Sequence, residues 1–359
     1  MSKDHTFHDN ILLKILGITR KAMQLTLGPI LLLLSLTISW VSASTTLSVC
    51  SSCTYTTITK ALAAIPSGST TYTISIAPGT YKEQVKISRS NVILKPSSSS
   101  GTVYLEYSAG HNTQSSSGSD TDSAVLTITG SNVKVYNMVV ANTYKQASNI
   151  ANLALNLAGT QASFYNVKFY GFQDTLLINS GGSGYFKSCY IEGSVDFIWG
   201  YGTGYFQGCT IASNQSGGFI TAHNRASSSA SGGFYFNSCT VKATVPSGPL
   251  SSTYSSSISF TSSSQFSSSC YLGRPWSKYA RVVFMYSNLG SHIKPVGWSA
   301  WSTSDARTSN VLFGEYSNSG SGAWSSSRAS FATKLSSTQA AQYSVSKVFG
   351  STSFIDTSV

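Results

Sequence analysis

Two aspartates, Asp174 and Asp196, are the residues of this chain whose type and spacing are best suited to chemistry. They lie 22 residues apart, in the segments Gly171-Phe-Gln-Asp-Thr-Leu176 and Ser194-Val-Asp-Phe-Ile-Trp-Gly200. Two carboxyl groups held side by side tend to differ in protonation, because two adjacent negative charges repel each other. Such a pair supplies an acid and a nucleophile within reach of one bond. A lone aspartate more often caps a turn, but two among apolar neighbours favour an active site.

A third segment, Leu272-Gly-Arg-Pro-Trp276, begins 76 residues after Asp196. The arginine in it, Arg274, can pair bidentately with a carboxylate and keep that carboxylate ionised and oriented. Trp276 offers a flat surface for stacking on a sugar ring. Taken alone, this segment is weak evidence of a site.

An internal repeat is the feature that would position these side chains. Five segments combine aromatic residues, a short polar stretch and alternating apolar residues. Their second aromatic residues are 29, 21, 20 and 30 residues apart: Tyr136, Tyr165, Phe186, Phe206 and Phe236. Periods of this length with short strands predict a solenoid, here an all-β, single-domain parallel β-helix. Asp174 and Asp196 are then about one coil apart, nearly one above the other.

The ends of the repeat region carry helical patterns. Residues 55–64 have helical spacing and are expected to cap the open end of the solenoid. Residues 329–341 also have a helical pattern and are expected to pack back on the coils. Serine-rich stretches predict loops or insertions at residues 97–101, 115–119, 227–231 and 251–264. No linker divides residues 44–359, so we expect one domain there.

The N-terminal 43 residues have a different composition from the rest. Four basic and two acidic side chains precede an apolar run over residues 30–40, and Val41-Ser42-Ala43 is a small-residue cleavage site. We expect a signal peptide cleaved near Ala43. An uncleaved anchor is the alternative, and a start codon set too far upstream of Met23 is another. Each of these places the folded domain outside the cytosol, and cleavage would make it a secreted, extracellular protein.

Composition narrows the class of protein. Charged residues make up 10% of the chain and hydrophobic residues 41%, which suits many short strands with polar turns. Residues 44–359 carry 19 basic and 10 acidic side chains, a net charge of +9, which favours a polyanionic partner. Basic runs with interleaved aromatics are missing from the sequence, so we expect no nucleic acid partner.

All six cysteines follow the N-terminal segment. Cys50 and Cys53 are expected to form a local structural disulfide or to be buried thiols. Cys189, Cys209 and Cys239 hold the same place in their repeats, so they should stack inward about 4.8 Å apart. A Cys189–Cys209 disulfide and a ladder of free thiols are equally compatible with this spacing.

The three segments around Asp174, Asp196 and Arg274 together resemble the signature blocks of the pectinesterase family. Further similarity runs collinearly through residues 50–355, and the closing blocks are more similar to the fungal branch than to the plant branch. The resemblance implies a right-handed parallel β-helix that removes methyl esters from the galacturonan of pectin. It implies no metal, no cofactor and a monomer, with a membrane involved only if the N-terminal segment is retained.

The resemblance also implies roles for individual residues. Asp196 would attack the C6 methyl-ester carbonyl, and protonated Asp174 would donate to methanol and then activate water. Gln173 would hydrogen-bond the oxyanion, and Arg274 would orient Asp196. The candidate substrate-binding residues are Trp276, Trp199, Phe172 and Tyr144.

Three positions depart from the family pattern. Ala151 stands where a second oxyanion-side glutamine is usual, which makes the adjacent Asn152 the candidate for the second donor. Trp199 replaces a usual phenylalanine and could narrow the cleft. His223, within His223-Asn-Arg225, is expected to be a loop histidine rather than a substrate contact.

The alternatives are a polygalacturonase or pectate lyase and a pectin-binding β-helix without turnover. The sequence contains neither the Asp-Asp pair nor the His-Gly block of a polygalacturonase, and its ten scattered acids do not suit the calcium cluster of a lyase. The alanine at position 151 keeps the pectin-binding alternative open.

Overall fold

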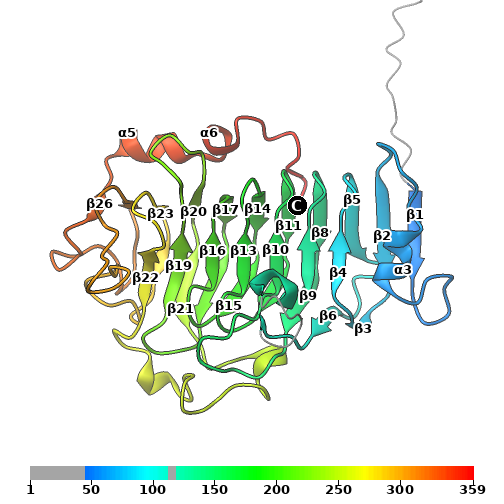
Figure 1. Ribbon diagram of the computed structural model, residues 1–359, viewed down its shortest axis with the longest axis horizontal. Helices are drawn as coiled ribbons and strands as arrows, with labels where there is room; N and C mark the ends of the chain where they lie inside the picture. Colours follow the sequence, from blue (N-terminus) through cyan, green and yellow to red (C-terminus); the bar gives the residue numbers. More distant parts are fainter. Residues whose placement is uncertain (1–44, 112–118) are drawn as a thin grey trace, which may run out of the picture. The chain divides into compact units, whose positions relative to one another are not determined.

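Strands dominate the computed structural model, which describes residues 45–111 and 119–359. The expected signal peptide or anchor lies outside these described residues. Neighbouring strands are parallel throughout the three sheets and, except at the two ends of the largest sheet, they are not consecutive in sequence. Between Tyr72 and Leu289 successive strands pass through the three sheets in turn, so each full coil there adds one strand to every sheet (Figure 1). The fold is a right-handed parallel β-helix, as the repeat and the resemblance predicted.

The three sheets are named A, B and C. Sheet A contains β1 (Thr45–Val49), β2 (Tyr72–Ile76), β5 (Val92–Pro96), β8 (Val133–Tyr136), β11 (Ala162–Tyr165), β14 (Ser183–Lys187), β17 (Thr203–Gln207), β20 (Gly233–Asn237), β23 (Arg281–Met285), β25 (Leu312–Tyr316) and β26 (Ala332–Lys334). Sheet B contains β3 (Gly79–Lys82), β6 (Val103–Tyr107), β9 (Met138–Asn142), β12 (Lys168–Tyr170), β15 (Tyr190–Gly193), β18 (Thr210–Ser213), β21 (Thr240–Ala243) and β24 (Asn288–Leu289). Sheet C contains β4 (Val85–Ile87), β7 (Leu126–Ile128), β10 (Leu155–Leu157), β13 (Leu176–Ile178), β16 (Ile198–Gly200), β19 (Phe219–His223) and β22 (Tyr271–Pro275).

Aromatic side chains form ladders on both faces of sheet A. Their register shows that the sequence alignment of the repeats, which placed Tyr165 opposite Phe186, was wrong by one residue. Phe164, not Tyr165, pairs with Phe186, and Tyr165 pairs with Lys187. Side chains alternate between faces, so a shift of one residue moves a side chain from the core to the outer surface. The inward ladder stacks at centroid distances of 4.6, 4.7, 4.5 and 4.2 Å through Phe164, Phe186, Phe206, Phe236 and Phe284.

The helix α3 (Ile58–Ala63) closes the N-terminal end, within the residues expected to form a cap. Thr57 caps it by accepting a hydrogen bond from the Lys60 amide, and Ile58 and Ala61 are buried in the core. The carboxylate of Glu83 accepts hydrogen bonds from the amides of Ile58 and Thr59 at 2.8 and 3.0 Å. A negative charge at a helix N-terminus stabilises the helix.

The C-terminal segment differs from the helical expectation for residues 329–341. Residues 332–334 form β26, and helical structure follows only in α5 (Ser337–Ala340), η4 (Ala341–Tyr343) and α6 (Val345–Phe349). Ser336 and Gln339 form a capping box that sets the start of α5. The segment then runs back over the outer tyrosines of sheet A toward β11, as expected for a packing segment (Figure 1).

The structure shows which cysteines form a disulfide and which are free thiols. Cys50 and Cys53 form a disulfide. Cys189, Cys209 and Cys239 are free and buried inside the coil, so the ladder of thiols, not a Cys189–Cys209 bridge, is present. Each thiol contacts a carbonyl oxygen of the preceding coil, at 3.5, 3.3 and 3.3 Å, which gives a weak donor a partner.

Candidate active site

Asp174 and Asp196 hold equivalent positions on successive coils of sheet C. Four residues pair in register on successive coils of this sheet: Leu126, Leu155, Leu176 and Ile198. The residues two positions before them therefore also occupy equivalent positions, and these are Ala124, Leu153, Asp174 and Asp196. The Asp174 amide donates to the Val195 carbonyl at 3.0 Å, which continues the ladder between the two turns. The structure therefore brings the two acids to adjacent turns, as their spacing predicted.

Both aspartates adopt left-handed backbone conformations, with φ of 64° and 50°. Aspartate is among the few residues other than glycine that visit this region readily. The turn thus directs both carboxyl groups out of the regular strand path before β13 and β16 begin.

Arg274 on β22 binds Asp196 bidentately. Its Nη2 lies 2.6 Å from Asp196 Oδ2, and its Nε lies 3.0 Å from Oδ1. The guanidinium is held between two aromatic rings, 4.3 Å from the Phe219 centroid and 4.4 Å from that of Trp301. Planar stacking and the fork of donors fix the arginine, so Asp196 has one orientation.

The two carboxyl groups differ electrostatically although their positions are equivalent. Burial raises the pKa of Asp196, and the Arg274 guanidinium opposes that rise. The pKa of Asp174 is raised well above its ordinary value, by burial first and then by the negative charges of Asp196 and Asp120. A single proton in the pair therefore resides on Asp174, and Asp196 is the ionised partner.

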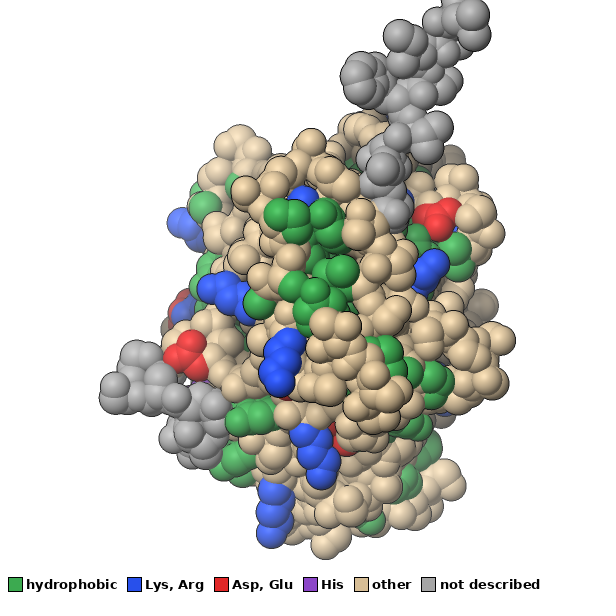
Figure 2. All heavy atoms as spheres, turned by 90° about the vertical axis from the view of Figure 1, so that its right-hand side faces the viewer, with side chains coloured by type: hydrophobic (Ala, Val, Ile, Leu, Met, Phe, Trp, Pro, Cys, Tyr) green, Lys and Arg blue, Asp and Glu red, His purple; other side chains and the backbone are tan. Residues whose placement is uncertain are grey.

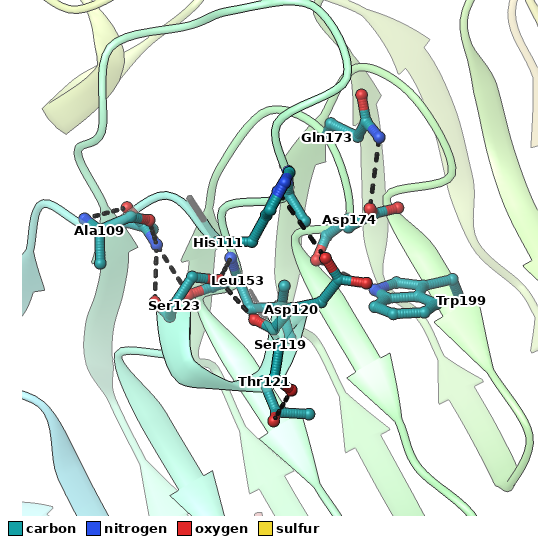
Figure 3. A network of polar contacts seen from close by, with 12 residues as sticks. Ala109, His111, Ser119, Asp120, Thr121, Ser123, Leu153, Gln173, Asp174 and Trp199 are labelled. Carbon is teal, nitrogen blue, oxygen red and sulfur yellow. Dashed lines mark hydrogen bonds and ion pairs between the residues drawn. The ribbon is translucent and has the colours of Figure 1, made fainter. Parts of the chain in front are cut away.

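Gln173 and Asn152 lie beside Asp174 in different arrangements. Gln173 points its Nε2 to within 3.4 Å of Asp174 Oδ2, and it is partly exposed (Figure 3). Asn152 is buried, and its Oδ1 accepts the Phe172 amide hydrogen at 3.1 Å. The backbone N–H of Asn152 donates to the Gln173 carbonyl at 3.0 Å. Asn152 thus fixes the backbone that carries Gln173; its role as a second oxyanion-side donor stays a prediction.

An apolar cluster forms one wall of the site. Ala151, the position of the missing glutamine, is buried in it with Leu153, Leu177 and Trp199. Trp199 donates its indole N–H to the Asp174 carbonyl at 3.1 Å, and its ring lies 5.4 Å from that of Trp276. This wall gives Asp174 the apolar surroundings that favour its protonated form.

The other two predicted substrate-binding residues, Phe172 and Tyr144, are less exposed to a ligand or lie outside the strands. Phe172 is buried, with 1% of its surface exposed, in a separate cluster with Tyr170 and Leu250. It has no surface for a ligand, so we do not retain it as a substrate contact. Tyr144 is partly exposed just after β9.

His223 is not in a loop, contrary to expectation. It ends β19, is fully buried, and accepts the Arg281 amide hydrogen through Nδ1 at 3.1 Å. Burial lowers its pKa to about 3, so the ring is neutral. A neutral, fully buried ring that accepts a backbone hydrogen bond is part of the coil framework.

Cavity size alone does not locate the acids. A cavity of about 840 Å³ lies between sheets A and B and is lined by residues that include Tyr104, Tyr136 and Lys168. A smaller cavity of about 480 Å³ lies beside Trp276 and is lined by Lys278 and Arg307. Within residues 45–111 and 119–359, no group of three or more His, Cys, Asp or Glu side chains is arranged to hold a metal ion.

Comparison with known proteins identifies the family of the chain. The sequence model of the pectinesterase family matches residues 44–353. The chain belongs to the pectinesterase family. A pectinesterase of Aspergillus aculeatus is 36% identical over 316 residues, which are 85% of this chain and 88% of that protein. Membership makes this chain a carboxylic-ester hydrolase, and the fungal relative agrees with the fungal-like closing blocks.

Solved structures of pectinesterases share the fold. The pectin methylesterase of Aspergillus niger, in deglycosylated form, superposes with a TM-score of 0.73 at 32% identity and covers 87% of this chain and 97% of its own. A mutant pectin methylesterase in complex with a hexasaccharide superposes with a TM-score of 0.66 at 28% identity, covering 82% and 93%.

Sequence reasoning missed several residues of this pectinesterase site. Phe219 and Trp301 hold Arg274, and Tyr201, which is 39% exposed, lies 4.8 Å from Trp276 between ring centroids. Asp120 follows a serine-rich stretch for which the sequence predicts a loop, yet its charge acts on Asp174, and His111 lies 3.8 Å from Asp120 (Figure 3). These residues come from distant parts of the chain, and no spacing rule links them.

Proposed function

We propose that this chain hydrolyses the C6 methyl esters of galacturonan in pectin, with Asp196 as nucleophile and Asp174 as acid and then base. The observation that carries the proposal is the asymmetry of the pair: Arg274 binds Asp196 bidentately, whereas Asp174 lies against Trp199 with a strongly raised pKa. The hexasaccharide complex of a related pectin methylesterase supports a pectin chain as the ligand.

In the first half of the reaction, a carboxylate oxygen of Asp196 attacks the ester carbonyl carbon. The carbonyl oxygen becomes an oxyanion, to which the Gln173 amide donates, at a benefit of about 3 kcal/mol. The bond to the methoxy oxygen then breaks, and that oxygen takes the proton of Asp174. Methanol leaves, and the galacturonyl group stays bound to Asp196 as an acyl-enzyme.

In the second half, Asp174 is ionised and takes a proton from water. The hydroxide attacks the acyl carbonyl carbon, the bond to Asp196 breaks, and galacturonic acid is released, whose carboxyl group then gives its proton to the solvent. Asp174 is again protonated and Asp196 again ionised, so the cycle closes. The first half needs Asp174 protonated and Asp196 ionised, and the contacts of Arg274 with Asp196 and the burial of Asp174 support this assignment.

The surroundings of the site suit a polysaccharide acid. Trp276 and Tyr201 offer aromatic surface, and Lys278 and Arg307 line the adjacent cavity. The net charge of +9 for residues 44–359 favours an anionic chain. Lys and Arg side chains are scattered, not gathered in a stripe, on the face shown in Figure 2. We infer a secreted monomer from the N-terminal sequence pattern and the family. In the part of the chain that the structure describes, no helix is long and apolar enough to cross a membrane.

Methanol release from methylated pectin tests the proposal. Wild-type protein should release methanol without new reducing ends or unsaturated ends, and Asp174→Ala and Asp196→Ala should lower kcat by at least about 10⁴-fold. Retained pectin binding by both variants would show that the loss is chemical. If the wild type binds pectin but releases no methanol, the chain is the pectin-binding protein without turnover and the proposal fails.

A further inference from the structure

A third acidic residue, Asp120, lies in the wall of the site next to Asp174. Its carboxylate lies between the ring of His111 and the Asp174–Trp199 pair in Figure 3. Its charge contributes to raising the pKa of Asp174, after burial and the charge of Asp196, and to raising the pKa of Tyr201, after burial. Asp120 is thus within electrostatic range of Asp174 and of the exposed ring of Tyr201.

A buried hydrogen-bond network fixes Asp120 to the coil. Asn142, fully buried, donates through Nδ2 to the carbonyls of Ala109, Ser123 and Leu153 at 2.8, 2.9 and 3.1 Å. Ser123 Oγ donates to the Asp120 carbonyl at 2.7 Å and accepts the Leu153 amide hydrogen at 3.1 Å. The short helix η1 (Asp120–Ser123) is therefore tied to the coil position directly before that of Asp174.

A neutral His111 ring does not neutralise the charge of Asp120. His111 Nδ1 lies 3.8 Å from Asp120 Oδ1, but the same nitrogen accepts the Ala151 amide hydrogen at 3.0 Å. A ring nitrogen that accepts a hydrogen bond carries no proton, so the proton of the neutral ring is on Nε2. Among the ion pairs of the described residues, Asp120 occurs only in this one.

We propose that Asp120 acts on the reaction through Asp174, as a fixed negative charge that keeps the proton shared by the two catalytic carboxyl groups on Asp174. The charged groups that face Asp174 are Asp196 from the turn before β16, Arg274 from β22 and Asp120 from η1. Asp196 and Asp120 favour the protonated form, and Arg274 opposes it. This inference rests on the proposed function, since it assigns Asp174 the roles of acid and base.

The electrostatic effect of Asp120 on Asp174 matters most in the acyl-enzyme. Once Asp196 is esterified it carries no charge, while Arg274 keeps its positive charge. Asp120 is then the remaining acidic neighbour that sustains the basicity of Asp174 when Asp174 must take a proton from water. Its side chain is 45% exposed, so solvent screens its effect in part.

The pH dependence of methanol release tests this role with a matched pair of variants. Asp120→Asn removes the charge, and Asp122→Asn removes a charge two residues away on the same short helix. With highly methylated pectin, we expect Asp120→Asn to lower kcat about threefold to tenfold on the alkaline limb, and to leave the acid limb unchanged. Asp122→Asn should follow the wild type. Thermal melting of both variants checks that the fold is intact.

A second measurement needs no turnover. The titration of the Asp174 carboxyl, followed by ¹³C NMR and assigned by its loss in Asp174→Asn, should move to lower pH in Asp120→Asn but not in Asp122→Asn. An unchanged titration and an unchanged alkaline limb in Asp120→Asn would overturn the role of Asp120. A shifted titration in a wild-type protein that releases no methanol would instead defeat the proposed function and leave the electrostatic coupling standing.

Discussion

Asp174 and Asp196 hold equivalent positions on adjacent coils, 22 residues apart, yet only Asp196 is bound by an arginine. The preceding coils carry Leu153 and Ala124 at the same position. The repeat thus supplies the frame for the pair, while Arg274, arriving from β22, makes the two acids chemically different.

The first prediction concerns stability. The folded protein holds the proton of Asp174 to a higher pH than the unfolded chain does, because the pKa of Asp174 is raised. Between the two pKa values the folded state binds more protons, so stability falls as pH rises. Asp174→Asn should therefore raise Tm by about 2 °C or more near neutral pH, and change it little below about pH 4. Calorimetry at the two pH values measures this. Asp196→Asn is the matched control and should lower Tm, since it leaves Arg274 without its partner.

The second prediction concerns Arg274. Arg274→Ala leaves the buried Asp196 carboxylate unpaired, which should cost about 3–5 kcal/mol of unfolding free energy near neutral pH. The pKa of Asp196 should rise, so the acid limb of the methanol-release profile should move to higher pH. Arg274→Lys keeps the charge but loses the fork and the stacking between Phe219 and Trp301, so it should restore only part of the activity. Full activity in Arg274→Lys would show that charge alone suffices.

A third prediction separates Gln173 from Asn152. Gln173→Ala should lower kcat by about 10²–10³-fold with little change in stability, because the lost donor acts on the oxyanion. Asn152→Ala removes the acceptor of the buried Phe172 amide and should cost about 1–3 kcal/mol of stability, with a smaller loss of kcat. Steady-state kinetics and denaturant unfolding of both variants measure the two effects. An equal loss of kcat in Asn152→Ala would make Asn152 the second oxyanion donor.

Salt dependence of binding gives a fourth prediction. Residues 44–359 carry a net charge of +9, so affinity for de-esterified pectin should fall about tenfold or more between about 50 and 500 mM salt. Binding should be measured by calorimetry with Asp196→Ala, which has no turnover. Fully methylated pectin carries no carboxylates and serves as the control, with little salt dependence expected. Equal salt dependence for both polymers would contradict an electrostatic contribution.

The sequence predicted the coil, the one-turn spacing of the two acids and the inward cysteines, because each coil of a solenoid repeats the same pattern of residues at a regular spacing. It did not predict the one-residue register of Phe164, since two aromatic residues in a row fit either face until strands pair. It also assigned residues 332–334 to a helix, where pairing with β25 prevails over local pattern.

What only the tertiary structure decided are the contacts that distant segments bring together. Free thiols rather than a Cys189–Cys209 bridge, the burial of His223 and Phe172, and the sandwich around Arg274 depend on side-chain directions that spacing does not encode. The place of Asp120 beside Asp174 depends on a buried asparagine, Asn142, that ties three segments together. The sequence by itself determined which coil carries the acids; folding decided which charges surround each acid, because electrostatic effects follow distance in space rather than along the chain.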